Sequence, residues 1–211
     1  MSLSRLAAAT LLIASVILAC LFVLADATGA SSPGSALAVT LGSLEAIAGV
    51  AALMAFPALL IGHPSRGRAL TLAGYIGIFV IAAFTNVFIS LTMALVVPWI
   101  AAQGVAVAQA PGAVGAIFFL LGPVQVVATA LLAAGALRAG RRLAGWTFVV
   151  AAVVSLAGFA PVPEFVDTIA GVLIFVGIAL VAAQGLGRDA TRSVDATAQD
   201  GTVSAAVAAR Q

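Results

Sequence analysis

The sequence predicts an all-α membrane protein: a six-transmembrane-helix bundle with its N-terminus and C-terminus in the cytoplasm. Three observations predict this fold class. Hydrophobic residues make up 64% of the chain and charged residues 8%, against roughly 45–50% and about 25% in soluble domains. The uncharged residues form runs long enough to cross a bilayer. The arginines fall in the connections between these runs and in the two ends of the chain.

The apolar runs define six predicted spans. An α-helix rises 1.5 Å per residue, so about 20 apolar residues cross an ~30 Å hydrocarbon core. By this measure the predicted helices cover residues of about 3–25, 38–62, 69–97, 113–137, 143–160 and 164–186. A transmembrane β-barrel is not indicated, because no segment alternates between polar and apolar residues over units of about ten.

Arginine placement sets the predicted orientation. Arginines in short loops mark the cytoplasmic side of a membrane protein. Six crossings place all the arginines that flank the spans on one side, namely Arg5, Arg66, Arg68, Arg138, Arg141, Arg142, Arg188 and Arg192. Five or seven crossings would divide these arginines between the two sides, so six crossings are preferred. The absence of lysine and the abundance of alanine, valine and glycine are typical of GC-rich bacterial genomes, so the expected membrane is the bacterial plasma membrane.

The first span has a second interpretation. Arg5, an apolar run and Ala25-Asp26-Ala27 together resemble a cleavable signal peptide. The run from Leu6 to Leu24 is longer than the apolar region of about 7–15 residues in such a peptide, which favours a retained helix. Cleavage would leave five helices in the same orientation.

Two regions of different character are predicted. Residues 1–186 form the helical bundle. Residues 187–211 are rich in alanine, threonine, serine and aspartate and contain no aromatic residue. Such a composition cannot bury much apolar surface, so these residues are expected to be a disordered cytoplasmic tail.

Polar residues inside the spans are the candidate functional residues, because a polar group in lipid needs a partner. Glu45, Asn86 and Gln125 all fall in the predicted outer half of the bundle, and Asp167 lies above them at the outer end of the last span. A shared outer cavity would let Glu45 bind a cation or a cationic solute, or pass a proton. The alternative is structural: a protonated Glu45 would join helices through Asn86 or Gln125.

Helix packing features accompany these candidates. Pro57 and Pro123 lie inside predicted spans, where each should kink its helix or free a carbonyl group. Small residues on the second span, Ala38, Gly42, Ala46 and Gly49, form a stripe suited to close helix packing. Tyr75 and Trp146 each lie near the start of an outward-running helix, where aromatic residues anchor helices at the headgroup level.

Several function classes lack support. Cys20 and His63 are the single cysteine and the single histidine, so neither a disulfide within the chain nor a usual metal site can form. No catalytic motif or phosphate-binding glycine loop occurs. We therefore expect no cofactor, no metal and no enzyme activity. Nucleic-acid binding is not expected, because the positive charge follows the membrane topology.

The chain resembles a group of small six-helix integral membrane proteins of unknown function that are common in actinobacteria. The resemblance covers residues 1–186 and rests on the order of spans and on the stretch Ala136-Leu137-Arg138-Ala139-Gly140-Arg141-Arg142-Leu143-Ala144-Gly145-Trp146. It implies the same architecture and no activity. The sequence thus predicts a small module that binds or transports a solute or ion, or alternatively a non-catalytic accessory subunit. The expected partners are the lipid bilayer and either another membrane protein or further copies of this chain.

Overall fold

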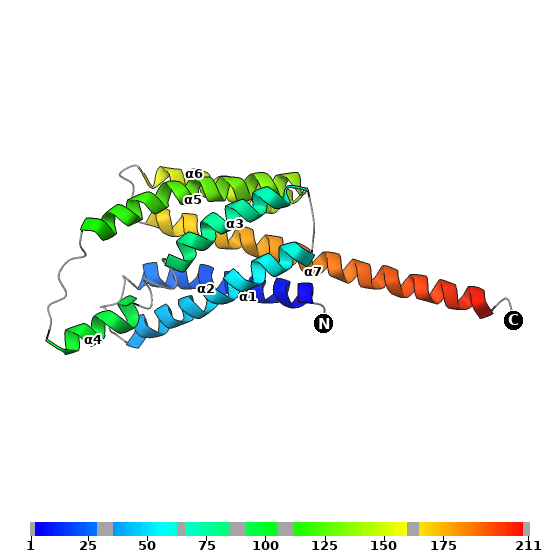
Figure 1. Ribbon diagram of the computed structural model, residues 1–211, viewed down its shortest axis with the longest axis horizontal. Helices are drawn as coiled ribbons and strands as arrows, with labels where there is room; N and C mark the ends of the chain where they lie inside the picture. Colours follow the sequence, from blue (N-terminus) through cyan, green and yellow to red (C-terminus); the bar gives the residue numbers. More distant parts are fainter. Residues whose placement is uncertain are drawn as a thin grey trace.

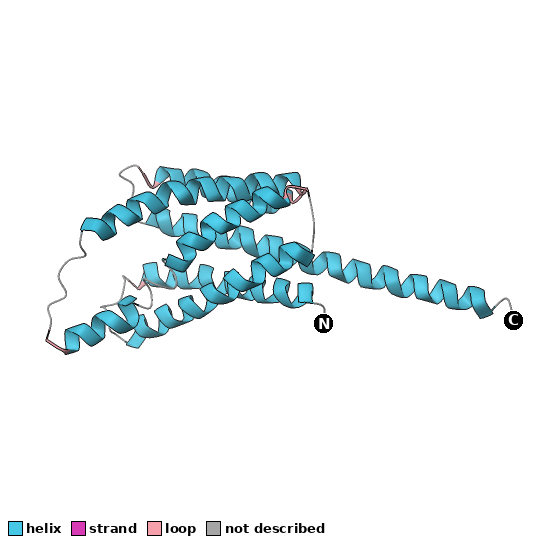
Figure 2. Cartoon of the chain, in the orientation of Figure 1, coloured by secondary structure: helices cyan, strands magenta, loops and turns pink. Residues whose placement is uncertain are grey.

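The fold is all-helical wherever the structure describes it. A computed structural model of the chain describes residues 3–28, 36–62, 66–84, 92–104, 112–159 and 165–208. Within these ranges the chain forms seven α-helices, two stretches of π-helix and no strand (Figure 2). The prediction of an all-α fold is confirmed for this part of the chain.

The helices follow the predicted spans closely over most of the chain. Their bounds are α1 Leu3–Ala27, α2 Ala36–Gly62, α3 Arg68–Ala82, the π-helix η2 Thr92–Val96, α4 Val97–Ala102, α5 Gly112–Arg138, α6 Arg142–Ala157 and α7 Phe165–Ala208. Helix α2 continues through Pro57 and α5 continues through Pro123. Neighbouring helices in a membrane protein can stabilise such prolines, because they supply partners for the freed backbone groups.

The long helices pack side by side in an order that differs from their order along the chain. Helix α1 packs against α2 and α7, α7 packs against α6, α6 against α5, and α5 against α3. Helices α2 and α3 meet in a much smaller contact, and η2 also packs against α2. Buried apolar residues from all of the long helices fill the centre, among them Leu11, Phe56, Leu132, Phe148 and Val181.

The basic turns lie together at one end of the bundle. Figure 1 shows the N-terminal end of α1, the C-terminal end of α2, the start of α3 and the α5–α6 turn at the same end. The α5–α6 turn is tight: the Arg141 N–H donates to the Ala136 carbonyl at 2.9 Å, and Gly140 has a φ of 75°. This is a Schellman-type helix end, in which a glycine adopts the left-handed conformation. Arg138 and Arg142 are exposed at this end, whereas Arg141 is buried.

The outer faces of the helices are apolar, as expected for contact with lipid. Large hydrophobic side chains are well exposed on several helices, including Ile47, Met54, Leu143, Trp146 and Val153. Within the part of the chain that the structure describes, four helical segments are long and apolar enough to cross a membrane: Leu3–Ala27, Val39–Leu60, Leu120–Arg138 and Phe165–Gly187. Helices α3 and α6 are apolar but shorter. By hydropathy, this is a helical membrane protein with several spans.

The third predicted span differs from the structure. The sequence predicts one helix over 69–97, but α3 ends at Ala82, and residues 83–84 and 92–96 have the wider winding of a π-helix. Residues 85–91, including Asn86, lie outside the described residues. Such winding interrupts the regular backbone hydrogen bonds, and hydropathy cannot reveal it because every residue there is compatible with a membrane helix. The connection between the predicted spans 69–97 and 113–137 also contains helix, because α4 covers Val97–Ala102.

The C-terminal region, for which the composition predicts a tail, is helical in the structure. Helix α7 continues without a break to Ala208, and Figure 1 shows its last part extending beyond the other helices. Alanine is the strongest helix former, and glutamine and arginine are also favourable, so the composition permits a helix that hydropathy does not indicate.

The small-residue stripe predicted on α2 is buried where it is described. Gly42, Ala46 and Gly49 are buried, whereas the side chain of Ala38 lies outside the described residues.

The two predicted aromatic anchors have different outcomes. Trp146 is exposed, as an anchor at the membrane surface should be. Tyr75 is instead 4% exposed and lies between α3 and α2. Its hydroxyl has a partner there, which makes burial favourable.

Candidate functional site

The structure brings together two of the four predicted site residues. Gln125 on α5 and Asp167 on α7 line the same cavity. Glu45 is half-buried on α2 and is not among the residues that line this cavity. Asn86 lies outside the described residues. The predicted polar cluster is therefore represented by Gln125 and Asp167, together with hydroxyl groups that the sequence did not single out.

The cavity has a volume of about 510 Å³ and lies among α1, α3, α5, α6 and α7. Its lining is mostly apolar, with Ile78 and Ile81 from α3, Leu121 from α5, and Ile174 from α7. Each helix contributes residues from the part of its length that is far from the basic turns. The cavity is therefore at the opposite end of the bundle from the arginines.

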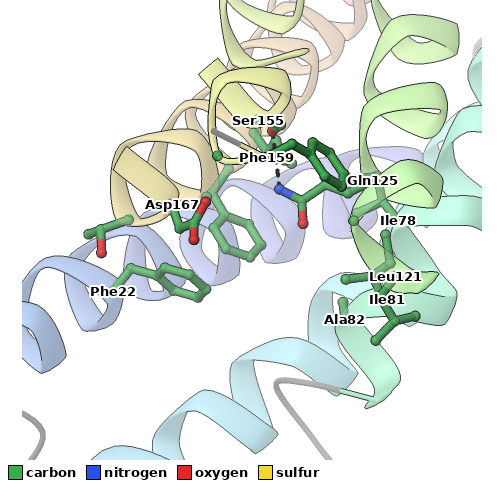
Figure 3. Close-up of a pocket in the computed structure, with 15 residues that line it drawn as sticks. Phe22, Ile78, Ile81, Ala82, Leu121, Gln125, Ser155, Phe159 and Asp167 are labelled. Carbon is green, nitrogen blue, oxygen red and sulfur yellow. Dashed lines mark hydrogen bonds between the residues drawn. The ribbon is translucent and has the colours of Figure 1, made fainter. Parts of the chain in front are cut away.

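A hydrogen bond between α5 and α6 forms the polar part of the cavity wall. The Gln125 side-chain amide donates from Nε2 to the Ser155 hydroxyl oxygen at 3.1 Å (Figure 3). Ser155 is 7% exposed and Gln125 is half-buried. This bond satisfies the buried Ser155 hydroxyl and one donor of the half-buried Gln125 amide.

Sequence analysis missed Ser155, although a signal for it exists. Helices α5 and α6 are antiparallel and joined by a tight turn, so residues equally far from the turn lie at the same height. Gln125 lies 13 residues before Arg138, the last residue of α5, and Ser155 lies 13 residues after Arg142, the first residue of α6. This hairpin register would have paired Gln125 with Ser155.

Asp167 lies at the rim of the cavity. It is exposed and occupies the first turn of α7. A carboxylate is stabilised there, because the N-terminus of a helix carries a positive partial charge. Its Oδ1 atom packs against Gly158 at the end of α6: a Cβ atom added to Gly158 would lie 2.5 Å from it. The absence of a side chain at Gly158 therefore makes room for the carboxylate.

Aromatic rings form much of the remaining wall, and two of them pack on glycines. The Phe159 ring packs against Gly122, and the Phe22 ring packs against Gly171. Phe22 also meets Phe175 edge-on, with ring centroids 5.5 Å apart and an interplanar angle of 62°. All three rings line the cavity. Figure 3 shows Asp167 and Gln125 on different walls, with Phe22 on one side and Ile78, Ile81 and Leu121 on the other.

The cavity's polar groups are suited to binding rather than to metal chemistry. Its polar side chains are one carboxylate, one amide and the hydroxyls of Ser155 and Thr168. Among the residues that the structure describes, no three histidine, cysteine, aspartate or glutamate side chains lie close enough together to hold a metal ion. His63 and Glu164 lie outside the described residues.

Comparison with known proteins gives no family for this chain. No protein-family model, no curated protein and no solved structure matches it. The interpretation of the cavity therefore depends on its own residues.

Proposed function

We infer that the protein binds a small solute from the outer side of the bacterial plasma membrane, in the cavity among α1, α3, α5, α6 and α7. It crosses the membrane six times with both termini in the cytoplasm. The N-terminus and the two basic turns lie at one end of the bundle, which by the positive-inside rule faces the cytoplasm. The cavity is at the other end and so opens outward.

Helix lengths support this placement. Asp167 and Arg188 bracket 20 uncharged residues of α7, which span roughly 30 Å, the thickness of the hydrocarbon core. Helices α3 and α6 have 15 and 16 residues and reach only about 22–24 Å. They end at the cavity, whereas α5 and α7 are longer. Residues at the ends of the two short helices line the cavity together with residues of the longer helices.

The cavity itself is the observation that carries the proposal. Its volume of about 510 Å³ is within the range of roughly 300–1,000 Å³ that small-molecule sites occupy. Ligand sites also combine an apolar lining with a few convergent polar groups. Gln125, Ser155, Thr168 and Asp167 provide such groups here.

The proposal concerns binding first, because the bundle is closed on the inner side of the cavity. Thr129, Leu132, Phe148 and Val181 are all almost fully buried between the cavity and the basic turns. A solute in the cavity would reach the cytoplasm only if these residues moved apart. Transport therefore requires a second conformation, and outward-facing binding does not.

A thermal-shift screen with cavity variants tests this function. The purified protein in lipid nanodiscs is melted in the presence of a mixed set of small organic cations, anions and neutral compounds. Ala82→Phe places a ring in the cavity, because Ala82 lines it. Ala183→Phe adds the same ring on an exposed part of α7.

We expect at least one solute to raise the melting temperature of the wild type and of Ala183→Phe but not that of Ala82→Phe. A screen without any such selective shift would count against the cavity as a ligand site.

A second function, that of an accessory subunit, is supported by α7. Its backbone continues as a helix for about 20 residues beyond the bundle, where Figure 1 shows no other element beside it. Most of the stability of protein helices comes from packing against other elements, so a partner protein would stabilise this part of α7. Pull-down from native membranes with the full chain and with a chain ending at Gly187 separates the two functions. A stoichiometric partner lost on truncation would support the accessory function.

A further inference from the structure

The charges around the cavity indicate which class of solute it takes. We propose that the ligand is a small organic cation with an apolar body, held by Asp167 and by the aromatic rings of the wall. This proposal depends on the proposed function, because it assumes that the cavity is the binding site. It goes further by assigning a charge and a shape to the ligand.

The side chains of the cavity favour positive charge. Asp167 is the single charged side chain among the described residues that line it. Because Asp167 is exposed at the rim, a cation can reach the carboxylate and still keep part of its hydration. The same carboxylate would repel an anion, and no lining residue that the structure describes is an arginine that could offset this repulsion.

The backbone adds to this preference. Helix α6 ends at Ala157, and Gly158, just beyond this end, lines the cavity. The C-terminus of a helix carries a negative partial charge and stabilises cations. Helix α7 presents the opposite end, but Asp167 lies in its first turn and offsets that positive end. One helix C-terminus and one carboxylate therefore adjoin the same space.

The aromatic rings suit a cation with an apolar body. Phe22, Phe159 and Phe175 line the cavity, and the face of an aromatic ring attracts ammonium groups. The same rings, with Ile78, Ile81 and Ile174, bury apolar surface of the ligand. A bare inorganic cation would gain little from such a lining, because it would lose hydration without enough oxygen ligands to replace it.

Gln125 provides an acceptor deeper in the cavity. One of the two N–H groups of its amide donates to Ser155, and its oxygen provides an acceptor for a ligand. Figure 3 shows this oxygen pointing away from Ser155. A carbonyl oxygen accepts hydrogen bonds and cannot donate them. The cavity thus presents acceptors to the ligand at two positions, as an ammonium group with N–H donors requires.

Three compounds of nearly equal size and different charge test the proposal. They are 1-naphthylmethylammonium, 1-naphthylmethanol and 1-naphthoate. Binding of each is measured at pH 7 by equilibrium dialysis against the protein in nanodiscs, with empty nanodiscs of the same lipid subtracted. The variants are Asp167→Asn, the matched control Asp26→Asn and the cavity-filling Ala82→Phe. Asp26 is exposed near the end of α1 and does not line the cavity. Each variant must elute as a single species with wild-type helicity.

We expect the ammonium compound to bind about tenfold more tightly than the alcohol and still more tightly than the naphthoate. Asp167→Asn should weaken the ammonium compound at least about fivefold and leave the alcohol unchanged. Asp26→Asn should alter neither, and Ala82→Phe should abolish binding of both.

The outcomes separate this proposal from the proposed function. If the alcohol or the naphthoate binds as tightly as the ammonium compound, and Ala82→Phe abolishes that binding, the cavity is a ligand site but the preference for cations is wrong. An unchanged affinity of the Asp167→Asn variant for the ammonium compound would also show that the preference for cations is wrong. If binding survives Ala82→Phe, the cavity is not the site and both proposals are wrong. If none of the three compounds binds while the thermal-shift screen finds a solute of another class, only the cation proposal is wrong.

Discussion

The hydroxyl group of Tyr75 donates a hydrogen bond to the backbone carbonyl of Leu53 at 2.7 Å. Leu53 lies four residues before Pro57, and proline has no N–H group to donate to that carbonyl. Tyr75 therefore replaces the helical hydrogen bond that Pro57 removes from α2. The Tyr75 ring also stacks on Phe56, with ring centroids 4.0 Å apart. These contacts lie in the small interface between α2 and α3.

Tyr75→Phe should destabilise the protein by about 0.5–1.5 kcal/mol, because it leaves a buried carbonyl group without a donor. The ring and its contact with Phe56 remain, so the hydrogen bond alone is tested. The free energy of unfolding is measured by chemical or thermal denaturation in a fixed detergent.

The double variant Tyr75→Phe with Pro57→Ala provides the control for this hydrogen bond. Alanine restores an N–H group that can donate to the Leu53 carbonyl, so Tyr75→Phe should cost much less in the Pro57→Ala protein than in the wild type. Equal costs in the two proteins would show that Tyr75 does not compensate for Pro57.

Gly74→Ala should destabilise the packing of α3 on α5 by about 1–3 kcal/mol, as overpacking in a close interface does. A Cβ atom at Gly74 would lie 2.6 Å from the Ala128 carbonyl oxygen and 2.7 Å from the Leu132 nitrogen. These atoms belong to the backbone of α5, so the helices must separate to make room.

Gly187→Ala is the matched control for Gly74→Ala, because nothing lies within 4 Å of a Cβ atom at Gly187. This change should leave the stability unchanged or raise it slightly through the better helix propensity of alanine. Equal effects at the two positions would contradict the close approach of α3 and α5.

The sequence predicts the helices well because hydropathy and the positions of arginines depend on the bilayer, which acts on each segment separately. The end of α3 at Ala82 is different, since it depends on backbone winding that composition does not report. The candidate site could be predicted from the sequence only in part. Gln125 and Asp167 could be found as polar residues in apolar surroundings. The cavity that they share depends on the order in which the helices pack. Depth in the membrane does not report that order, so it could not show that Glu45 does not line the cavity.

Cysteine labelling tests the six crossings and their direction. Cys20 is replaced by serine, and single cysteines are introduced at Thr28, Ala69 and Gln103, which are all exposed. Ala69 lies at the basic end of the bundle. Thr28 and Gln103 follow the ends of α1 and α4 that are far from the basic turns. In intact cells, a membrane-impermeant maleimide should label the cysteines at 28 and 103 but not at 69. Labelling at 69 should appear only after the membrane is permeabilised. The reverse pattern would invert the orientation, and a difference between 28 and 103 would contradict the crossing number.

Gly158→Ala should separate the position of the Asp167 carboxylate from its charge. The new Cβ atom would lie 2.5 Å from Oδ1 of Asp167, which is the flexible end of a side chain, so the carboxylate moves and the backbone does not. Gly158 has a φ of −61°, a value that alanine adopts without strain. The free energy of unfolding should therefore change by less than about 1 kcal/mol, while the affinity for 1-naphthylmethylammonium falls.

The same change made in the Asp167→Asn protein shows how Gly158 acts. If Gly158 matters because it positions the carboxylate, then Gly158→Ala should have little further effect on affinity once the charge is gone, since the two residues act through one contact. Equal losses in both proteins would mean that the methyl group blocks the cavity directly. An unchanged affinity in the single variant would mean that the carboxylate binds equally well from its displaced position. The packing of Asp167 against Gly158 would then follow from the meeting of the two helix ends and would not be a feature of the binding site.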